Sequence, residues 1–326
     1  MSDSVTSPNR SAASGASRAE TRDLDLPALV AALSRANGGS TALKEQRYAC
    51  SQPLPSRTAV LEIVESLRAV LFPRYFGNAD LTEDTIQYHI GSTLDRVSRE
   101  LREQVRRGLC FACMRAKVDS CDECEDRADG ITRDFLRRLP AIRHLLATDV
   151  EAAYLGDPAA TSPDEAIFCY PGVQALTYYR IAHEMYVLGV PLIPRIITEQ
   201  AHSVTGIDIH PGAQIDESCF IDHGTGVVIG ETCRIGKRVR IYQGVTLGAK
   251  SFPLDEHGNP IKGVKRHPDV EDDVIIYSEA TLLGPITIGR GSVIGGNVWV
   301  THSVPLDSRV TQAQPQHAYY ESGGGI

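Results

Sequence analysis

Aliphatic residues recur every six positions through the last third of the chain. The first block comprises Ile209, Ile215, Ile221, Val227, Cys233, Val239 and Val245, and after a break a second block comprises Val270, Ile276, Leu282, Ile288, Ile294 and Val300. A parallel track runs beside the first block through Ile229, Ile235, Ile241 and Leu247. A helix needs an apolar period of about 3.6 residues and an ordinary strand about 2, so neither explains this pattern. Three six-residue units make one triangular turn of a β-solenoid, which the pattern predicts over residues 201–305.

The repeat is interrupted over residues 249–269, which hold three prolines and a cluster of basic side chains. Such an insertion is expected to leave the solenoid as an external loop, where function is often placed. Residues 306–326 follow the repeat as a tail that ends in three glycines and Ile326.

The chain upstream of the solenoid has helical periodicity. Amphipathic patterns predict helices from Thr58 to Tyr75, Leu81 to Arg107, Ile131 to Leu146 and Val173 to Val187, within a helical domain over 23–200. Thr82 is a candidate cap for the second helix, although Thr85 does not supply the acidic partner of a capping box. Residues 1–22 are rich in small and polar residues and are expected to form a disordered leader.

Composition restricts the functional class. The chain of 326 residues has 42% hydrophobic and 23% charged residues and a formal net charge of −8. This negative balance argues against nucleic acid or an anionic membrane as a partner. No apolar run approaches the roughly 20 residues of a membrane span, and no hydrophobic signal core begins the chain, so we expect a cytoplasmic protein.

The densest polar cluster in the repeat is Asp222-His223, followed by Gly224-Thr225-Gly226. Histidine ordinarily titrates near neutrality and suits a general base, and a carboxylate on its other nitrogen would fix its tautomer. Asp208 is a candidate for that carboxylate because the coiling brings it towards His223. A solvated corner histidine is the alternative interpretation.

Two further positions have both a structural and a functional interpretation. Arg266, next to His267 in the inserted loop, could bind a substrate carboxylate with two hydrogen bonds, or it could belong to a surface basic patch. Asp157, in the sequence Gly156-Asp157-Pro158, taken alone is a turn former.

Four cysteines form a paired CxxC array, Cys110, Cys113, Cys121 and Cys124. Four thiolates suit tetrahedral zinc, and each pair has the usual knuckle spacing, although the gap between the pairs is short. The pattern leaves open a structural zinc site, a redox pair or inert thiols.

Several of these segments together resemble the serine O-acetyltransferase family. The matching runs are Asp208-Ile209-His210-Pro211-Gly212-Ala213, Ile221 to Thr232, Gln243 to Gly248, Asp157-Pro158-Ala159, Tyr179 to His183 and Arg266-His267-Pro268. The resemblance covers about residues 140 to 305. It implies an α+β protein in which an N-terminal α-helical domain precedes a left-handed parallel β-helix, and it implies acetyl transfer from acetyl-CoA to L-serine.

The resemblance also implies roles for individual residues. His223 is expected to be the general base and Asp208 its orienting partner. The serine zwitterion is expected to contact Asp157, Asp222, Arg266, His267 and Glu231. Acetyl-CoA is expected near Gly248, Ala280 and Gly295, although the segment Tyr277-Ser278-Glu279-Ala280 departs from the Gly-Ala-Gly-Ala pattern of the family.

Partners follow from the same resemblance. It implies a homotrimer or hexamer with sites between subunits, feedback inhibition by L-cysteine, and binding of O-acetylserine sulfhydrylase by Ile326 at the C-terminus. An unstructured end is the alternative for Ile326. Three other functions stay open on the sequence, namely an acyltransferase for a sugar or amino-sugar acceptor, a zinc lyase that uses histidines such as His202 and His210, and a non-catalytic regulatory partner.

Overall fold

The computed structural model describes residues 25–34, 53–116 and 123–313. The chain divides into two compact units, residues 1–51 and 52–326. In the first unit the described element is helix α1 (Leu26–Ser34), whose start is capped by the side chain of Asp25 through the backbone N–H of Ala28 at 3.0 Å. The leader expected over residues 1–22 lies outside the described residues.

The second unit begins with long amphipathic helices. They are α3 (Arg57–Leu71), α4 (Glu83–Arg115), α5 (Glu123–Gly156), α6 (Pro163–Cys169), α7 (Pro171–Val187) and α8 (Ile193–Thr205). The helices expected from the sequence are all present, and α4 and α5 are longer than expected. At the start of α4, Thr82 and Thr85 form a capping box, because the Thr85 hydroxyl takes the place of the expected carboxylate.

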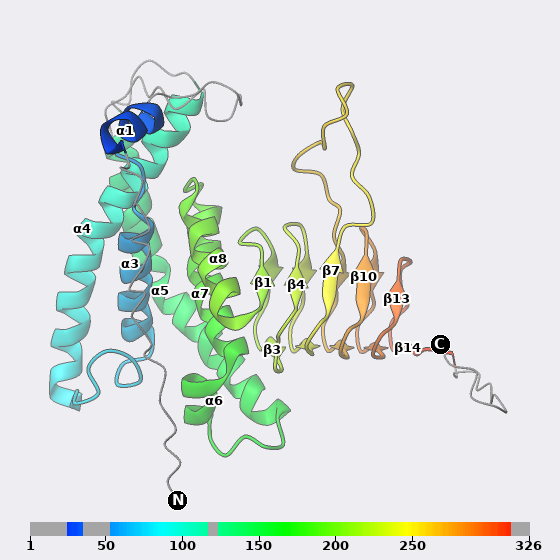
Figure 1. The fold of residues 1–326 in the computed structure, drawn as a ribbon. Helices are drawn as coiled ribbons and strands as arrows, with labels where there is room; N and C mark the ends of the chain where they lie inside the picture. Colours follow the sequence, from blue (N-terminus) through cyan, green and yellow to red (C-terminus); the bar gives the residue numbers. More distant parts are fainter. Residues whose placement is uncertain (1–24, 35–52, 117–122, 314–326) are drawn as a thin grey trace, which may run out of the picture. The chain divides into compact units, whose positions relative to one another are not determined.

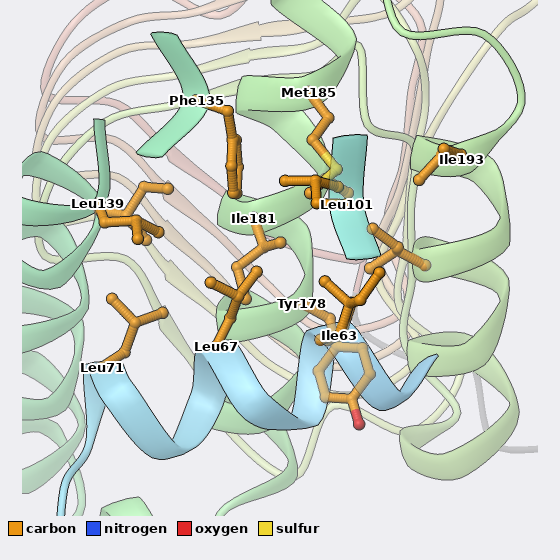
Figure 2. Close-up of a cluster of buried hydrophobic side chains, with 14 of the residues drawn as sticks. Ile63, Leu67, Leu71, Leu101, Phe135, Leu139, Tyr178, Ile181, Met185 and Ile193 are labelled. Carbon is orange, nitrogen blue, oxygen red and sulfur yellow. The ribbon is translucent and has the colours of Figure 1, made fainter. Parts of the chain in front are cut away.

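The apolar stripes of these helices meet in one core (Figure 2). Leu67 of α3, Leu101 of α4, Phe135 of α5 and Ile181 of α7 are each at most 1% exposed. Burial of such side chains contributes roughly 1.5–3 kcal/mol each before entropy is counted. This core fixes the directions of α5 and α7, so that the end of α5 and the start of α7 lie against the solenoid.

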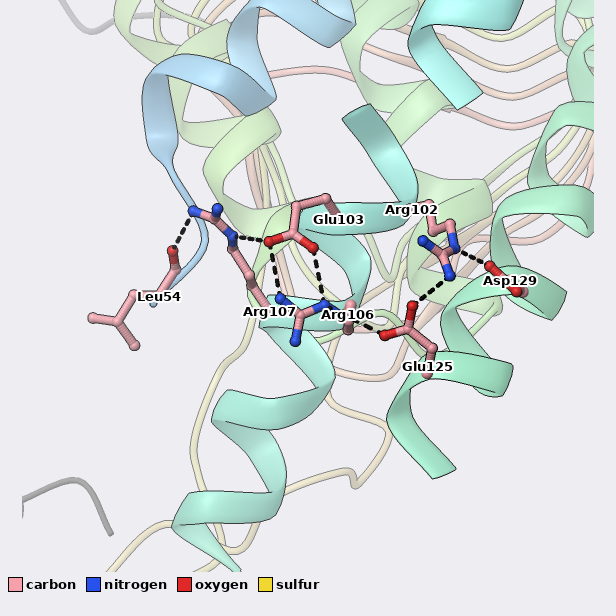
Figure 3. Close-up of polar contacts among 7 residues, drawn as sticks. All are labelled: Leu54, Arg102, Glu103, Arg106, Arg107, Glu125 and Asp129. Carbon is pink, nitrogen blue, oxygen red and sulfur yellow. Dashed lines mark hydrogen bonds and ion pairs between the residues drawn. The ribbon is translucent and has the colours of Figure 1, made fainter. Parts of the chain in front are cut away.

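Ion pairs connect α4 to α5 on the polar side of the helices (Figure 3). Arg102 contacts both Glu125 and Asp129 of α5, and Arg106 lies 3.6 Å from Glu125. Within α4, Glu103 accepts hydrogen bonds from Arg106 and Arg107, and mainly the bond from Arg106 lowers the pKa of Glu103 to about 2.

The C-terminal part is a solenoid of short parallel strands (Figure 1). In the described residues the strands form three parallel sheets, ordered β1-β4-β7-β10-β13, β11-β8-β5-β2 and β14-β12-β9-β6-β3. The strands are β1 (Asp208–Ile209), β2 (Gln214–Ile215), β3 (Phe220–Ile221), β4 (Val228–Ile229), β5 (Arg234–Ile235), β6 (Arg240–Ile241), β7 (Thr246–Gly248), β8 (Asp269–Val270), β9 (Ile275–Ile276), β10 (Thr281–Leu283), β11 (Thr287–Ile288), β12 (Val293–Ile294), β13 (Trp299–Val300) and β14 (Arg309–Val310). Each strand pairs with the strand of the next coil, so the chain forms the left-handed β-helix expected from the sequence. The helices run to Thr205 and the strands from Asp208 to Val310, slightly beyond the expected limits of 201 and 305.

The register shows that the two aliphatic tracks of the sequence are two inward positions on each side of the prism. Ile209 pairs with Ile229, Ile215 with Ile235 and Ile221 with Ile241, and all of these side chains are buried. Val227, Cys233, Val239 and Val245 are also buried but lie two residues earlier in each repeat. The first six-residue track drawn from the sequence therefore mixes the two inward positions, because it passes from one to the other between Ile221 and Val227. Its second block returns to the first position, because Val270 pairs with Ile235.

The insertion lies between β7 and β8 and projects from the strands as a long loop (Figure 1). Leu254 and Pro260 form an antiparallel bridge within it. At its end, Arg266 and His267 return to the solenoid.

Candidate active site

The corner between β3 and β4 is two residues longer than the usual corner, which keeps equivalent inward positions six residues apart. Ile221 and Ile229, which occupy the same inward position, are separated by eight residues, and the extra length is turned by His223, Gly224 and Gly226, whose φ angles are 55°, 78° and 80°. The enlarged corner places the His223 side chain in solvent, where it is 74% exposed. Its Nδ1 lies 3.8 Å from Oδ1 of Asp222.

Two glycines let helices approach this corner closely. A Cβ on Gly156, the last residue of α5, would lie 2.5 Å from the ring of Phe220 in β3, and one on Gly172 in α7 would lie 2.1 Å from the carbonyl oxygen of Ile221. Larger residues would therefore push the end of α5 and the start of α7 away from β3. As a result Asp157, which follows α5, and Tyr170, which precedes α7, lie near this corner, where the charge of His223 acts on Asp157 and that of Asp222 acts on Tyr170.

Asp157 is held in position by hydrogen bonds. Its Oδ1 accepts a bond from the backbone N–H of Ala159 at 2.8 Å, and its Oδ2 accepts one from the Tyr170 hydroxyl at 2.6 Å. The Tyr170 bond is the main cause that lowers the pKa of Asp157, followed by the Ala159 bond, and the charge of His223 acts in the same direction. We call Asp157, Tyr170, Asp222 and His223 the His223 corner. It presents two carboxylates and an imidazole to solvent, a set that suits a cationic group beside an alcohol.

A second polar cluster forms at the next corner, where β4 ends. The Arg266 guanidinium lies 2.5 Å from Oε2 of Glu231, and Oε1 of Glu231 accepts a hydrogen bond from Tyr186 of α7 at 3.2 Å. Glu231 is thus placed to orient Arg266. Burial opposes ionisation of Glu231, but the hydrogen bond from Arg266 and the charges of His210 and Arg266 together lower its pKa.

His267 is locked against the same corner. A Cβ on Gly230 would lie 2.1 Å from the His267 ring, so only glycine allows the ring to pack here. Nδ1 of His267 accepts a hydrogen bond from the backbone N–H of Thr232 at 3.1 Å and lies 2.9 Å from the Thr232 hydroxyl. Burial, then the charge of Arg266, lowers the pKa of His267 to about 4. The neutral ring therefore keeps its proton on Nε2, from which it can donate to a substrate.

Thr232 also accepts hydrogen bonds from the backbone N–H groups of Arg266 at 3.0 Å and of His267 at 3.2 Å. It attaches the end of the long loop to the solenoid. We call Tyr186, Glu231, Thr232, Arg266 and His267 the Arg266 cluster. No role for Thr232, Tyr170 or Tyr186 could be predicted from the sequence, because each contributes through contacts between distant segments that no local motif encodes.

Asp208 lies at the start of β1, paired with Val228 of β4. Among the described residues, the ion-pair contact of His223 within one chain is with Asp222 and not with Asp208. The His223 corner precedes β4 and the Arg266 cluster follows it, so one chain carries these two groups on different corners of the prism.

The residues expected near acetyl-CoA occupy different environments. Ala280 is fully buried inside the solenoid, and its N–H and carbonyl are both used in hydrogen bonds with Tyr277 and Thr246. Its side chain therefore faces the interior rather than a ligand. Gly248 at the end of β7 and Gly295 after β12 are partly exposed.

The structure gives no support for the zinc site that the cysteine spacing left open. Cys110 and Cys113 both lie inside α4, and residues three apart on a helix share one face, so this CxxC is a helical packing pattern and not a zinc knuckle. Sγ of Cys113 lies 3.6 Å from Sγ of Cys124 in α5. In the part of the chain that the structure describes, no group of three or more His, Cys, Asp or Glu side chains is arranged to hold a metal ion. Cys121 and Ile326 lie outside the described residues.

Comparison with known proteins agrees with the fold. A family model described as a hexapeptide repeat of succinyl-transferase matches residues 226–252 and 269–302. A protein of Synechococcus elongatus named "Serine acetyltransferase, plasmid" is 54% identical over 310 residues, which are 94% of this chain and 96% of that protein. The solved structure of serine acetyltransferase 1 from Entamoeba histolytica in complex with L-cysteine is 42% identical to this chain and has a TM-score of 0.66. The match covers 76% of this chain and 86% of that one. Serine acetyltransferase isoform 3 from the same organism, in complex with cysteine, is 32% identical to this chain and has a TM-score of 0.64. That match covers 85% of this chain and 90% of the isoform 3 chain.

Together the left-handed β-helix, its hexapeptide repeat and these relatives define a hexapeptide-repeat acyltransferase. Within that class, the chain belongs to the serine acetyltransferase family. Over the described residues, no helix is both long and apolar enough to cross a membrane.

Proposed function

We propose that this protein transfers the acetyl group of acetyl-CoA to the hydroxyl of L-serine, giving O-acetyl-L-serine and CoA. The observation that carries the proposal is the His223 corner, where an exposed imidazole stands beside two carboxylates in a chain of this family. A serine molecule bound there would place its ammonium against Asp157 and Asp222 and its hydroxyl against the imidazole of His223.

The proposed reaction is direct transfer within a ternary complex. His223 takes the proton of the serine hydroxyl as its oxygen attacks the thioester carbon, and the tetrahedral intermediate then expels the CoA thiolate. The imidazolium returns the proton to that sulfur, so the histidine ends as it began. Holding the alcohol against the base replaces a bimolecular encounter with a positioned attack.

Arg266 and His267 are proposed to bind the serine carboxylate and the rest of the acceptor. Glu231 orients the guanidinium through its 2.5 Å contact, and the neutral His267 ring offers its Nε2 proton. Because one chain carries these groups on a different corner from His223, we propose that a second subunit supplies them. A ring of three prisms would repeat the same heterologous contact and close. Asp208 is proposed to orient His223 in that assembly, and a hexamer would need a further contact between two such rings.

Further partners are proposed from the family relationship. L-cysteine, which is bound in two of the similar solved structures, would occupy the serine site as a feedback inhibitor because it differs from serine in one atom. Ile326 would contact O-acetylserine sulfhydrylase through its terminal carboxylate. Acetyl-CoA would lie along Gly248 and Gly295, and the protein would work in the cytoplasm.

The acceptor is tested by measuring CoA thiol release from acetyl-CoA with L-serine, D-serine and an amino sugar. We expect release with L-serine and not with the amino sugar, because Arg266 and the two aspartates suit a zwitterion. Release with the amino sugar and not with L-serine would refute the proposal.

The shared site is tested by mixing two inactive variants. His223→Ala keeps the Arg266 cluster and Arg266→Ala keeps the His223 corner, so co-expression should restore about a quarter of the sites in randomly mixed rings. Mixed protein with no more activity than the two variants measured separately would contradict a site shared between subunits.

A further inference from the structure

Thiol groups lie together where α4 ends and α5 begins. Sγ of Cys113 lies 3.6 Å from Sγ of Cys124, and Cys110, which precedes Cys113 by three residues in α4, also acts on the pKa of Cys124. Cys113 lies two residues before Arg115, the last residue of α4, and Cys124 is the second residue of α5. The reaction proposed for the His223 corner uses none of these thiols.

The thiols differ in how easily a small molecule can reach them. Cys110 and Cys124 are 2% and 3% exposed, whereas Cys113 is half-buried at the edge of the same core. A reagent in solution therefore meets Cys113 first, and the buried Cys124 can react only with a sulfur that its own chain brings to it. An accessible thiol beside a second thiol that can displace what binds to it is the usual arrangement of a redox-active pair.

The contact between the two sulfurs is close enough for a disulfide to form with little movement. An S–S bond is about 2.05 Å long, so the separation of 3.6 Å must fall by about 1.5 Å. Rotation of the two side chains and a small shift of the helix ends can supply this movement, because both residues lie within two positions of an end. We propose that Cys113 and Cys124 form a reversible disulfide when the protein meets a small-molecule disulfide.

The bond would form by two successive exchanges. The thiolate of Cys113 attacks one sulfur of the small disulfide, whose S–S bond breaks and releases one small thiol. The thiolate of Cys124 then attacks the sulfur of Cys113 and expels the second small thiol. The two protein thiols are oxidised by two electrons and lose two protons, and the small disulfide is reduced to two thiols that take up those protons.

The disulfide would fasten the end of α4 to the start of α5. A cross-link between these helices restricts the unfolded chain and so stabilises the folded helical core. In a reducing compartment the pair persists as thiols, and the bond forms when the surroundings become oxidising. The stability of the helical core would thus depend on the redox state of the cell.

The experiment maps the bond in the native wild-type protein. The protein is incubated with excess oxidised glutathione, its remaining thiols are blocked with N-ethylmaleimide, and it is digested with trypsin. Tryptic peptides 108–115 and 118–127 each hold two of the cysteines. Mass spectrometry should find these two peptides joined, two hydrogen atoms lighter than their sum, and fragmentation should locate the bond between Cys113 and Cys124. Dithiothreitol should remove it. Cys169, exposed at the end of α6, should carry a glutathione adduct and shows that the reagent is active.

Two double variants with equal numbers of thiols test the route. Cys110→Ala/Cys121→Ala keeps the proposed pair and should link like the wild type. Cys113→Ala/Cys121→Ala keeps the two buried thiols and should link at least roughly tenfold more slowly, because no small disulfide reaches a buried thiol. Oxidation should raise the urea midpoint of unfolding in the first variant and leave it unchanged in the second.

A native protein in which Cys169 is modified but the two peptides stay separate would overturn the inference. A bond located between other cysteines, or equal rates of linking in the two double variants, would do the same. A linked protein whose urea midpoint is unchanged would refute the stabilising role. The wild-type map decides the matter if a variant does not fold. None of these measurements uses acetyl transfer, so the result is independent of the proposed function.

Discussion

Arg180 and Asp149 form a buried ion pair that joins the helices to the first coil of the solenoid. Nε and Nη2 of Arg180 lie 2.6 Å and 2.8 Å from the two carboxylate oxygens of Asp149, and the side chains of Arg180 and Asp149 are 3% and 0% exposed. The remaining hydrogen-bonding groups are satisfied by the solenoid, because Arg180 donates to the carbonyls of Ile215 and Asp216, and Asp149 accepts from the N–H of Cys219. The pair therefore holds α5 and α7 against the coil that leads into the His223 corner.

Arg180→Met should destabilise the protein strongly, because it leaves the Asp149 carboxylate buried without a counter-charge. The expected loss is about 3–5 kcal/mol in the free energy of unfolding, measured in urea. Arg99→Ala, which removes an exposed ion pair with Asp95, should change it by less than about 1 kcal/mol. Similar losses of unfolding free energy in the two variants would show that the buried pair does not stabilise the contact of α5 and α7 with the first coil.

His223→Ala should lower kcat by about 10²- to 10⁴-fold, since it removes the proposed base while leaving the donor contacts intact. KM for acetyl-CoA should change little. His302→Ala, at an exposed histidine of the last coil, is the control and should keep wild-type kinetics. A His223→Ala enzyme with near-normal kcat would exclude general-base catalysis by this residue.

Arg266→Ala should mainly raise KM for L-serine, by roughly 10- to 100-fold, because a charged hydrogen bond to the substrate carboxylate is lost. Glu231→Gln should cause a smaller rise, since the guanidinium stays but loses the carboxylate that orients it. Lys262→Ala, an exposed residue of the same loop, should leave KM unchanged. If Arg266→Ala lowered kcat and left KM for serine intact, the proposed carboxylate contact would be wrong.

His267 should make the folded protein less stable as the solution becomes acidic. Its pKa is about 4 in the folded state, whereas an unfolded histidine has a pKa of about 6.5. Between these values the unfolded chain binds a proton that the folded chain excludes, so stability is lost as the pH falls from about 6.5 towards 4. In His267→Gln this part of the loss should disappear, whereas His257→Gln, exposed in the same loop, should follow the wild type. Unfolding free energies at pH 7 and pH 5 that change equally in all three proteins would contradict this assignment.

The helical thiols should differ in reactivity. Burial, and next the hydrogen bond with Cys113, raises the pKa of Cys124, and the thiolate is the reactive form. Iodoacetamide should therefore label the exposed Cys169 first, the half-buried Cys113 more slowly, and Cys110 and Cys124 only after unfolding. Mass spectrometry of timed samples gives the order. Labelling of Cys124 as fast as Cys169 would mean that α4 and α5 do not bury it in solution.

Much of the solenoid could be predicted from the sequence, because inward aliphatic residues at a fixed spacing are a direct consequence of its geometry. The phase of the repeat could not be predicted at one point. Ile221 and Val227 are both aliphatic and six residues apart, so nothing local reveals that they occupy different inward positions. Only the pairing of Ile221 with Ile241 and of Ile209 with Ile229 shows that the corner between Ile221 and Ile229 is enlarged.

The candidate site was predictable to the extent that it lies in short motifs. Asp222, His223 and Arg266 stand out because polar groups interrupt an apolar repeat or follow its break. Tyr170 and Thr232 do not, since each acts through a hydrogen bond to a residue many positions away, Asp157 or His267. The cysteine pattern left a zinc site open for a related reason, because a CxxC within a helix and one in a zinc knuckle have the same spacing but different backbone directions.

The enlarged corner also determines how far the His223 imidazole projects from the wall of the solenoid. The two added residues are confined to the corner between β3 and β4, so the later coils keep their alignment. The distance by which the His223 side chain projects can therefore change without a change in the strands of the solenoid. Deleting Gly224 and Thr225 would shorten the step to the standard length and should draw the histidine back towards the wall. The resulting protein would keep its prism but present a flat edge, which is how a non-catalytic relative could arise from this enzyme by a two-residue deletion.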